Sequence, residues 1–494
     1  MIVVLLILIP LLSGLAAFAF RDERAVRAWS LFSCIVTLLI SIAGIAIIKD
    51  QDLLQYRADW LSGLGSSISL RLDGMGQLLC LLTAMAYPLV FFATWKTSYR
   101  KSHNFYALML LAQAGLMGVF LAMDALLFYF FWELALIPMY FLCSQWGGEK
   151  RIAVTFKFFI YTFVGSVLML IAILYIYSQT PGRSFDIEAF YQAALSKKEQ
   201  GWLFWLFFIA LAVKMPVFPF HTWQPDTYEQ SPSATTMILN AVMAKMGLLG
   251  LLRWLFPVLP LASFQWADFI TPLALIGGIY AGLIAIRQDD LKKLIAYSSI
   301  AHMGLMCAAA FAQNQSGLQG VMIQMFNHGI IIIGLWIVVD IIEKQLGTKK
   351  ISELGGLAQK APALAIGLVV ISLANIALPL TSAFPGEFLM FNGIFNSLTK
   401  YNVWFIVLAG LGIIIGAVYT LNMIRKVFFG EMNSITQSAR DAWSNEKLVL
   451  ALIIMLILVL GIYPQLALNE SREVSAAINQ KFEMVRELLT EQKK

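Results

Sequence analysis

Six ionisable side chains stand inside long apolar segments of this sequence. They are Glu133, Lys214, Lys245, His302, His328 and Glu387. A charged side chain at the centre of a lipid bilayer costs roughly 2.5 to 3.5 kcal/mol even on the lenient insertion scale, so each one needs an explanation. All six lie near the middle of their segments, and Lys, Glu and His can each take up and release a proton. The set therefore predicts a proton path at one depth of a membrane.

Glu133 and Lys214 are the most suggestive pair. Lys214 directly precedes Met-Pro-Val-Phe-Pro, and these prolines remove backbone donors and interrupt a helix. A buried lysine holds its proton more readily beside a carboxylate, so moving Glu133 away would release the proton from Lys214. The alternative is a static buried ion pair that locks two helices together.

The other four residues extend this pattern. Lys245 has no obvious partner within its own helix, which suits a group that accepts and passes on a proton. His302 and His328 are predicted to bridge, because imidazole titrates near neutral pH and relays a proton between its two nitrogens. Glu387 stands in a second proline interruption, Leu378–Glu387. The alternative for each histidine is a hydrogen-bonded core side chain.

The composition indicates an integral membrane protein. Of 494 residues, 60% are hydrophobic and 13% are charged, whereas water-soluble domains carry about 25% charged residues. A large water-soluble domain is thereby excluded. The four cysteines stand singly, without the Cys or His spacing of a zinc or iron–sulfur site, so we expect the chain itself to bind no cofactor and no metal.

Fourteen apolar runs are long enough to cross a bilayer, and they predict an all-α polytopic membrane protein. The runs cover residues 2–20, 28–48, 75–95, 105–122, 125–144, 154–178, 201–220, 232–255, 267–286, 291–311, 318–343, 362–398, 403–424 and 447–468. Prolines interrupt the seventh and the twelfth run. Paired interruptions an odd number of helices apart are typical of transporters built from inverted repeats, although prolines are also common in membrane helices generally.

We divide the chain into four parts. Residues 1–104 hold helices 1–3, residues 105–255 and 256–430 form two inverted repeats, and residues 431–494 hold helix 14 and an amphipathic tail. The tail is predicted to be an interfacial or partner-contacting helix, or else a frayed end. In the turn before the fifth run, Asp124 is predicted to cap the helix.

Lysine and arginine predict the orientation. Loops after odd-numbered runs hold more than twice as many of these residues as loops after even-numbered runs. By the positive-inside rule, the odd loops face the cytoplasm and both termini lie on the outer side.

Three strings give the chain a family resemblance. Phe-Trp-Glu-Leu at 131–134, Lys-Met-Pro-Val-Phe-Pro-Phe-His-Thr-Trp at 214–223, and the segment from Arg-Gln-Asp-Asp to His-Met-Gly at 287–304 resemble the antiporter-like membrane subunits of respiratory complex I. The resemblance covers about residues 70–430. It implies fourteen helices, two inverted five-helix repeats, and broken helices 7 and 12.

The resemblance also implies roles for the buried residues. Glu133 and Lys214 would be the functional ion pair and Lys245 the central relay. The two histidines would lie on the same hydrated axis, and Glu387 would exchange protons with the outer side. A glutamate at this last position marks one branch of the family, and lysine marks the others. Ser382–Pro385 departs from a glycine-rich stretch that is commoner in the family, which leaves the geometry of this break open.

The resemblance finally implies an assembly. The chain would be a non-redox, proton-translocating subunit of an NADH:quinone oxidoreductase in a bacterial inner membrane. Its partners would be other membrane-arm subunits, including flanking antiporter-like chains, and no nucleic acid. NADH oxidation and quinone reduction would take place in other subunits.

Other functions fit the same residues. An Mrp-type cation/proton antiporter subunit would need oxygen-rich coordination of sodium or potassium, and this axis offers two carboxylates against two lysines, which favours protons. A subunit of a membrane-bound hydrogenase on the same module, or a membrane scaffold with static ion pairs, is the further alternative.

Overall fold

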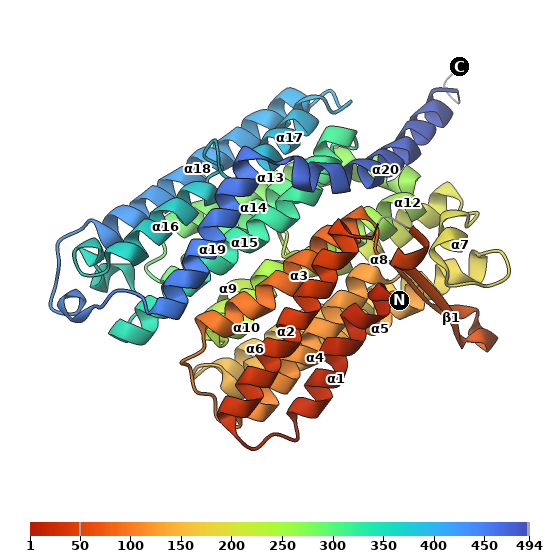
Figure 1. Ribbon diagram of the computed structural model, residues 1–494. Helices are drawn as coiled ribbons and strands as arrows, with labels where there is room; N and C mark the ends of the chain where they lie inside the picture. Colours follow the sequence, from red (N-terminus) through yellow and green to blue (C-terminus); the bar gives the residue numbers. More distant parts are fainter. Residues whose placement is uncertain (49–50, 492–494) are drawn as a thin grey trace.

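Apolar runs of the predicted length form helices throughout the computed structural model, which describes residues 1–48 and 51–491. The long helices lie side by side in one bundle (Figure 1). The N-terminal part consists of α1 (Ile2–Ala17), α2 (Glu23–Ala46), strands β1 (Gln55–Leu61) and β2 (Ser66–Arg71), and α3 (Gly74–Ala93).

The first interrupted helix belongs to the next group of elements. This group comprises α4 (Ser102–Leu121), α5 (Ala125–Trp146), α6 (Arg151–Gln179), α7 (Ile187–Tyr191), α8 (Lys197–Lys214), α9 (Gln224–Gln230), α10 (Ser233–Ile238), the π-helical turn η3 (Leu239–Met243), α11 (Lys245–Gly250), a second π-helical turn η4 (Leu251–Leu255), and α12 (Phe256–Val258). The segments from α10 to α12 follow one another without a break, so Ser233–Val258 forms one continuous membrane-length helix.

The second interrupted helix belongs to the remaining group. This group comprises α13 (Pro260–Ile286), α14 (Leu291–Ala310), α15 (Gln315–Leu346), α16 (Pro362–Asn375), α17 (Ala383–Phe395), α18 (Asn402–Phe428), α19 (Ser444–Ile462) and α20 (Gln465–Glu491). Short 3-10 turns occupy Gln51–Leu54, Ser62–Leu64, Ile351–Glu353, Leu357–Gln359 and Thr436–Ser438.

Each of the fourteen apolar runs contains a helix; the seventh is helical only as far as Lys214, and the interrupted twelfth is the pair α16 and α17. Within the described residues, ten helices are long and apolar enough to cross a membrane, and α1 and α16 are shorter apolar helices. The helical, multi-span fold is therefore confirmed. The count of fourteen crossings, the inverted relation of the repeats and the four-part division of the chain stay predictions.

Aspartates begin many of these helices. Asp22, Asp73, Asp124, Asp186 and Asp290 each precede a helix, and the side chain of each accepts a hydrogen bond from a backbone N–H of the first turn. Such a cap satisfies donors that would otherwise be left unpaired at the helix end. The predicted cap at Asp124 is confirmed.

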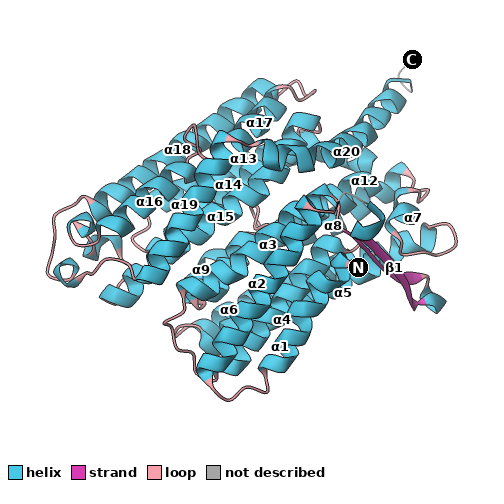
Figure 2. Cartoon of the chain, in the orientation of Figure 1, coloured by secondary structure: helices cyan, strands magenta, loops and turns pink. Residues whose placement is uncertain are grey.

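Neither the β-hairpin (Figure 2) nor the short helix α7 was predicted, and both lie outside the fourteen apolar runs. Strands β1 and β2 pair antiparallel, with an irregular register at Asp59–Leu61. Gly65 turns the chain with φ +70°, and a side chain there would clash with the carbonyl oxygen of Arg183 at 2.2 Å. Ser66 Oγ donates to Asp124 Oδ1 at 2.9 Å, which ties the hairpin to the start of α5.

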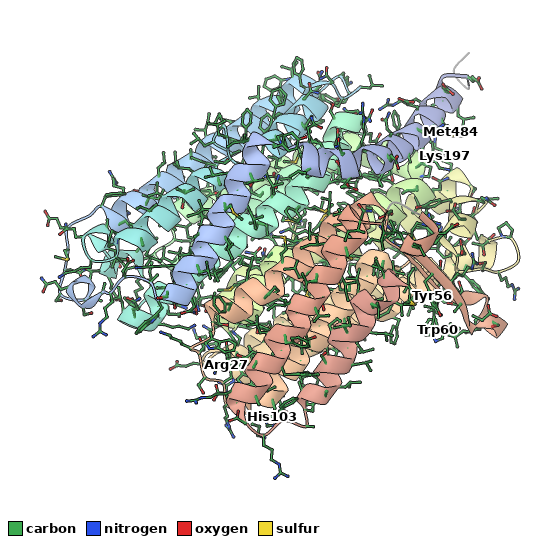
Figure 3. The ribbon with its side chains drawn as sticks, in the orientation of Figure 1. Arg27, Tyr56, Trp60, His103, Lys197 and Met484 are labelled. Atoms are coloured by element: carbon green, nitrogen blue, oxygen red, sulfur yellow. The ribbon has the colours of Figure 1, made fainter. Side chains whose placement is uncertain are left out.

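Residues from loops after odd-numbered runs and residues from segments after even-numbered runs lie at opposite ends of the bundle. Figure 3 shows Arg27 and His103 at one end, and Tyr56, Lys197 and Met484 toward the other. Segments after odd-numbered and even-numbered runs are therefore separated as the predicted topology requires. The bundle end with Arg27 and His103 is called the basic end below.

The C-terminal tail is an ordered helix rather than a frayed end as far as Glu491. α20 packs against α3, α13 and α15 of its own chain. Ile478, Phe482 and Val485 point inward and are buried. Leu488, which shares their spacing, is 59% exposed. The apolar face of this tail thus packs against its own chain over most of its length.

Candidate proton-relay site

The structure brings four of the six predicted residues into one continuous series of contacts. They come from four different helices of the bundle: α11 supplies Lys245, α15 supplies His328, α14 supplies His302, and α17 supplies Glu387. The other two residues, Glu133 on α5 and Lys214 at the end of α8, lie outside this series.

Lys245 begins the series just after a π-helical turn. Its Nζ donates to the backbone oxygen of Asn240 at 3.0 Å and lies 2.9 Å from Nδ1 of His328. The expectation that Lys245 has no partner within its own helix is therefore wrong. A π-helical turn widens the helix and changes which carbonyl oxygens are available, which explains how a residue five positions earlier can accept this bond.

Asn240 is itself held from a neighbouring helix. Ser299 of α14 donates through Oγ to the side-chain oxygen of Asn240 at 2.6 Å. The three residues Ser299, Asn240 and Lys245 are all fully buried. Because the backbone oxygen of Asn240 holds Lys245, this arrangement fixes where the lysine ammonium points.

The two histidines and Glu387 continue the series. The rings of His302 and His328 lie 5.2 Å apart between centroids at an interplanar angle of 54°. Nδ1 of His302 lies 3.4 Å from Oε1 of Glu387. Gln324, one helical turn before His328 on α15, lies 3.5 Å from the same carboxylate oxygen through Nε2.

Glu387 lies in a helix and not in the break itself, so its predicted place needs correction. The irregular segment covers residues 376–382, and α17 starts at Ala383. Asn327 of α15 donates through Nδ2 to the backbone oxygen of Ser382 at 2.6 Å and so fixes the start of α17. Gly461 of α19 lies against this irregular segment, because a Cβ atom at this position would stand 2.2 Å from the backbone oxygen of Leu380.

A small cavity adjoins the end of the series. It has a volume of about 40 Å³ and is lined by His302 and Glu387 together with Asn375 and Tyr419. This volume is enough for one or two water molecules. Tyr419 Oη lies 2.9 Å from Ser298 Oγ, and Asn375 Nδ2 donates to the same oxygen at 3.2 Å, so the wall of the cavity is partly polar.

The first break is arranged differently. α8 ends at Lys214, as predicted, and the chain stays irregular until α9 begins at Gln224. Lys214 is 2% exposed, and its Nζ has no hydrogen-bond partner among the described residues. The nearest recorded contact of Nζ is the ring of Trp132, with its centroid 5.4 Å away.

Glu133 lies near Lys214 without touching it. The carboxylate interacts electrostatically with the lysine. In the part of the chain that the structure describes, however, no hydrogen bond or ion pair joins the two, and the buried Oε1 of Glu133 has no partner. The predicted ion pair is thus open in this structure.

A glycine lets α11 approach the first break. A side chain at Gly247 would meet the backbone oxygen of Leu211 at 2.7 Å and the Cβ of Met215 at 2.9 Å. Gly247 and Lys245 belong to the same short helix, but residues two positions apart face different sides, so the contact with α8 is made by the glycine side of α11 and Lys245 faces α15. No direct contact between Lys214 and Lys245 is present among the described residues.

Sequence reasoning missed a charged network at the basic end. Lys349 pairs with Glu229 at 2.7 Å and with Asp290 at 3.4 Å. Lys293 lies 3.6 Å from Asp226 and 3.8 Å from Glu229. All of these residues except Asp290 line a polar cavity of about 920 Å³ that opens between the two groups of helices.

This network shifts the ionisation of its members. Burial alone would raise the pKa of Glu229, but hydrogen bonds from Lys349 and Gln230 and the charges of Lys349 and Lys293 outweigh it and lower that pKa. Burial alone would lower the pKa of Lys349, but the hydrogen bond to Glu229 and the charges of Asp290 and Glu229 outweigh it and raise that pKa. The pair therefore stays ionised across neutral pH.

Asn240, Ser299 and Gln324 were also missed. Each is buried beside the relay. Neutral polar side chains are common in membrane helices, so they carry no signal of the kind that a lysine or a glutamate gives. Their spacing offers a weak signal after the fact, because Gln324 and His328 are four residues apart and share one face of α15.

No metal site is formed by these groups within residues 1–48 and 51–491, since no three His, Cys, Asp or Glu side chains cluster there. The four cysteines are all buried in the bundle.

Comparisons with known proteins place the fold and the site in context. Residues 122–425 match the family described as "NADH:quinone oxidoreductase/Mrp antiporter, TM". NADH-quinone oxidoreductase subunit M of Rickettsia typhi is 36% identical over 484 residues, covering 95% of this chain and 96% of the relative. F(420)H(2) dehydrogenase subunit M of Methanosarcina mazei is 33% identical, covering 96% of this chain and 97% of the relative.

A solved structure agrees over the full length. A chain of respiratory complex I from Thermus thermophilus superposes with a TM-score of 0.91 at 28% identity, covering 98% of this chain and 100% of that one.

Proposed function

The chain belongs to the NADH:quinone oxidoreductase/Mrp antiporter transmembrane family, and on this premise we propose that it is a proton-translocating membrane-arm subunit of an NADH:quinone oxidoreductase. One observation supports proton transfer by this chain above all others. Lys245, His328, His302 and Glu387 form a series of close contacts between buried titratable groups.

Each contact in the series suits one proton transfer. Lys245 holds a proton on Nζ that Nδ1 of His328 can accept at 2.9 Å. The buried Nε2 of His328 is then the atom that passes a proton on toward His302. Between the rings, a centroid separation of 5.2 Å suits transfer through one bridging water.

The last transfer ends on a carboxylate. Nδ1 of His302 lies 3.4 Å from Glu387, and the adjoining cavity has room for water that can carry the proton onward. A proton that leaves Glu387 regenerates the carboxylate, and a new proton arriving at Lys245 restores the starting state.

Glu133 and Lys214 act in this proposal as the loading pair. With the pair open, the buried ammonium of Lys214 has no hydrogen-bond acceptor and is poised to give up its proton. When Glu133 approaches, the charge on Lys214 is stabilised and the lysine holds the proton. Motion of this pair would therefore control when a proton moves toward Lys245.

Redox chemistry belongs to partner subunits in this proposal, and the chain itself binds no cofactor. The names of two relatives support this division, because one belongs to an NADH-quinone oxidoreductase and the other to an F(420)H(2) dehydrogenase. A subunit shared by oxidoreductases with different electron donors has a task apart from electron donation. We also propose a bacterial inner-membrane location, with both termini on the outer side.

Proton pumping by the assembled complex tests the proposal. Membrane vesicles would carry wild-type protein, Lys245→Ala, or the control Lys197→Ala, and NADH oxidation would be recorded alongside quinone-dependent acidification. Lys197 is exposed at the end of the bundle opposite His103 (Figure 3). Removing a proton relay typically costs a factor of about 100 or more in transfer rate.

Three outcomes are distinguishable. Loss of pumping with Lys245→Ala, and normal pumping with Lys197→Ala, supports the relay. Normal pumping with both variants makes the buried contacts structural, as in a membrane scaffold. Sodium-dependent pumping in the wild type favours a cation/proton antiporter instead.

A further inference from the structure

A second pocket lies at the basic end, away from the relay. The end of α3, the end of α15 and the segment before α19 enclose a cavity of about 700 Å³. Asn445 of α19 donates through Nδ2 to the backbone oxygen of Phe92 at 2.9 Å, which holds α19 against the end of α3. α19 lies on the outside of the bundle, beside α15 and α16 (Figure 1).

The pocket has a surplus of positive charge. Asp441 is paired with Lys447 at 2.9 Å, and Lys344 is paired with Asp340. The other two basic side chains in the wall, Lys96 and Arg440, form no ion pair among the described residues. The buried carboxylate of Glu446 also lines the pocket and interacts electrostatically with Lys96. With Glu446 counted, the pocket keeps one net positive charge, which one anionic group would balance.

An aromatic side chain marks the depth of the pocket. Nζ of Lys96 lies 3.2 Å from the centroid of the Trp443 ring, and Trp443 is 50% exposed. Tryptophan is enriched where the lipid headgroups meet the hydrocarbon layer. The pocket therefore lies at the level of the headgroups.

An apolar groove leads away from the pocket along α19. Its walls are apolar side chains between Ala451 and Tyr463. Leu448, Met455 and Ile462 share one face of the helix and are 51%, 52% and 67% exposed. From Leu448 to Ile462 the helix rises roughly 21 Å, which exceeds the ~15 Å thickness of one leaflet.

We propose that this pocket and groove together bind one membrane phospholipid. Lys96 and Arg440 hold the phosphate, the Trp443 ring packs beside the headgroup, and an acyl chain lies along the exposed face of α19. Basic pockets between membrane helices are known to take the headgroups of anionic lipids. The lining of the pocket contains none of the four residues of the relay series.

The neighbouring cavity differs from this pocket. Of the five lysines that line the larger cavity around Glu229 and Lys349, all but Lys150 are paired with carboxylates, and its walls lie between the two helix groups. It lacks both an unpaired basic pair and an apolar groove leading from it. Only the pocket beside α19 combines these two features among the cavities described above.

Lipid analysis of the purified, assembled complex tests the proposal. Phospholipid retained after purification in a mild detergent would be counted by mass spectrometry for wild type and for the double variant Lys96→Gln/Arg440→Gln. The matched control is Lys101→Gln/Lys360→Gln, which removes two exposed charges at the same end outside the pocket. We expect the double variant to lower retention of one lipid roughly tenfold or more and the control to leave it unchanged.

A second variant tests the groove. Ala451→Phe places a large side chain where the acyl chain would lie and leaves both basic residues intact, so it should also release the lipid. Equal retention in all variants overturns the proposal. If Lys96→Gln/Arg440→Gln fails to assemble, Arg440→Gln alone and Ala451→Phe decide the matter.

The source of the phosphate is tested separately. Inorganic phosphate is added to the purified wild-type complex, and its binding is measured together with lipid retention. Tight binding of inorganic phosphate that Ala451→Phe does not change, with no retained lipid, would show a phosphate site and contradict a lipid site.

Discussion

The two helix breaks of this protein differ in whether their buried charged side chain contacts other polar side chains. At the break between α16 and α17, Glu387 contacts His302 and Gln324. At the break after α8, Lys214 has no hydrogen-bond partner in the described chain, and Glu133 stands apart from it. The charged side chain at the second break is therefore held by its neighbours, whereas the lysine at the first break is not.

The helices that face each break account for the difference. α15 is buried along its whole membrane window and presents Gln324 and Asn327 toward α17. α5, which carries Glu133, is buried over 56% of its window, and nearby Phe130 and Ile137 are exposed. A side chain on a half-exposed helix has room to move, whereas one against α15 is held.

This difference suggests a division of labour. In the function proposed above, the held contacts would be the path along which protons move, and the open pair would be the place where a change of geometry acts. Partner subunits that contact the exposed face of α5 would be able to move Glu133. Substitutions at Glu387, Glu133 and Ser299 test this division.

Glu387→Ala should have the largest effect. It removes the carboxylate at the end of the held series, so proton pumping should fall on the order of a hundredfold. Glu387→Asp keeps a carboxylate and should retain a larger part of the activity. Proton pumping in vesicles, measured beside NADH oxidation, checks both. Equal loss with Asp and Ala would mean that the side chain matters for packing and not for protons.

Glu133→Gln should act more mildly, by roughly tenfold. It keeps the size of the side chain and removes a charge whose interaction with Lys214 amounts to a few kcal/mol at an effective dielectric constant of about 20. Glu133→Asp, which keeps the charge, serves as the comparison. The initial rate of acidification is the measurement. A wild-type rate for Glu133→Gln would make the open pair a packing feature.

Ser299→Ala should lower pumping a few-fold. It removes the hydrogen bond to the side chain of Asn240, which is worth about 1 kcal/mol, and thus loosens the residue that orients Lys245. Because Lys245 itself is unchanged, Ser299→Thr should restore most of the rate. The pH dependence of pumping should shift in Ser299→Ala, and an unaltered profile would argue against a positioning role.

Lys349→Gln should leave pumping almost unchanged and lower stability by about 1 kcal/mol at neutral pH. Lys349 helps to lower the pKa of Glu229 against the opposing effect of burial. The stabilisation is therefore present at neutral pH and is lost as the pH falls through that lowered pKa. At the alkaline end it is lost as pH rises through the raised pKa of Lys349.

Thermal unfolding of the purified complex at neutral and acid pH measures this effect. The variant should differ from wild type at pH 7 and converge with it at low pH. Lys350→Gln is the control, because Lys350 pairs with Glu353 in an exposed position and should change the melting temperature less. A constant difference at all pH values would contradict the assigned linkage.

The sequence predicts the helices and the charged members of the site well, for one physical reason. A lysine or glutamate in an apolar run is costly, so Lys245 and Glu387 stand out without any structure. The same reasoning finds the two breaks, because proline removes a backbone donor. The computed structure then corrects details: Glu387 lies within α17, and Lys245 has a partner on its own helix.

What the sequence does not predict depends on contacts between distant segments. The strands β1 and β2 are too short and too polar to be recognised in the sequence as a long apolar run. Asn240 becomes important only because a π-helical turn and Ser299 meet there. The open state of Glu133 and Lys214 is likewise a matter of distance, which residue type alone does not give.

His328→Ala tests the central claim most directly, because His328 is the link between Lys245 and His302. The measurement is the number of protons pumped per NADH oxidised in membrane vesicles that hold the fully assembled complex. We predict that the ratio falls by the share that this subunit contributes, and that His103→Ala, at the basic end, leaves it unchanged. A wild-type ratio with His328→Ala would contradict proton transfer through this series.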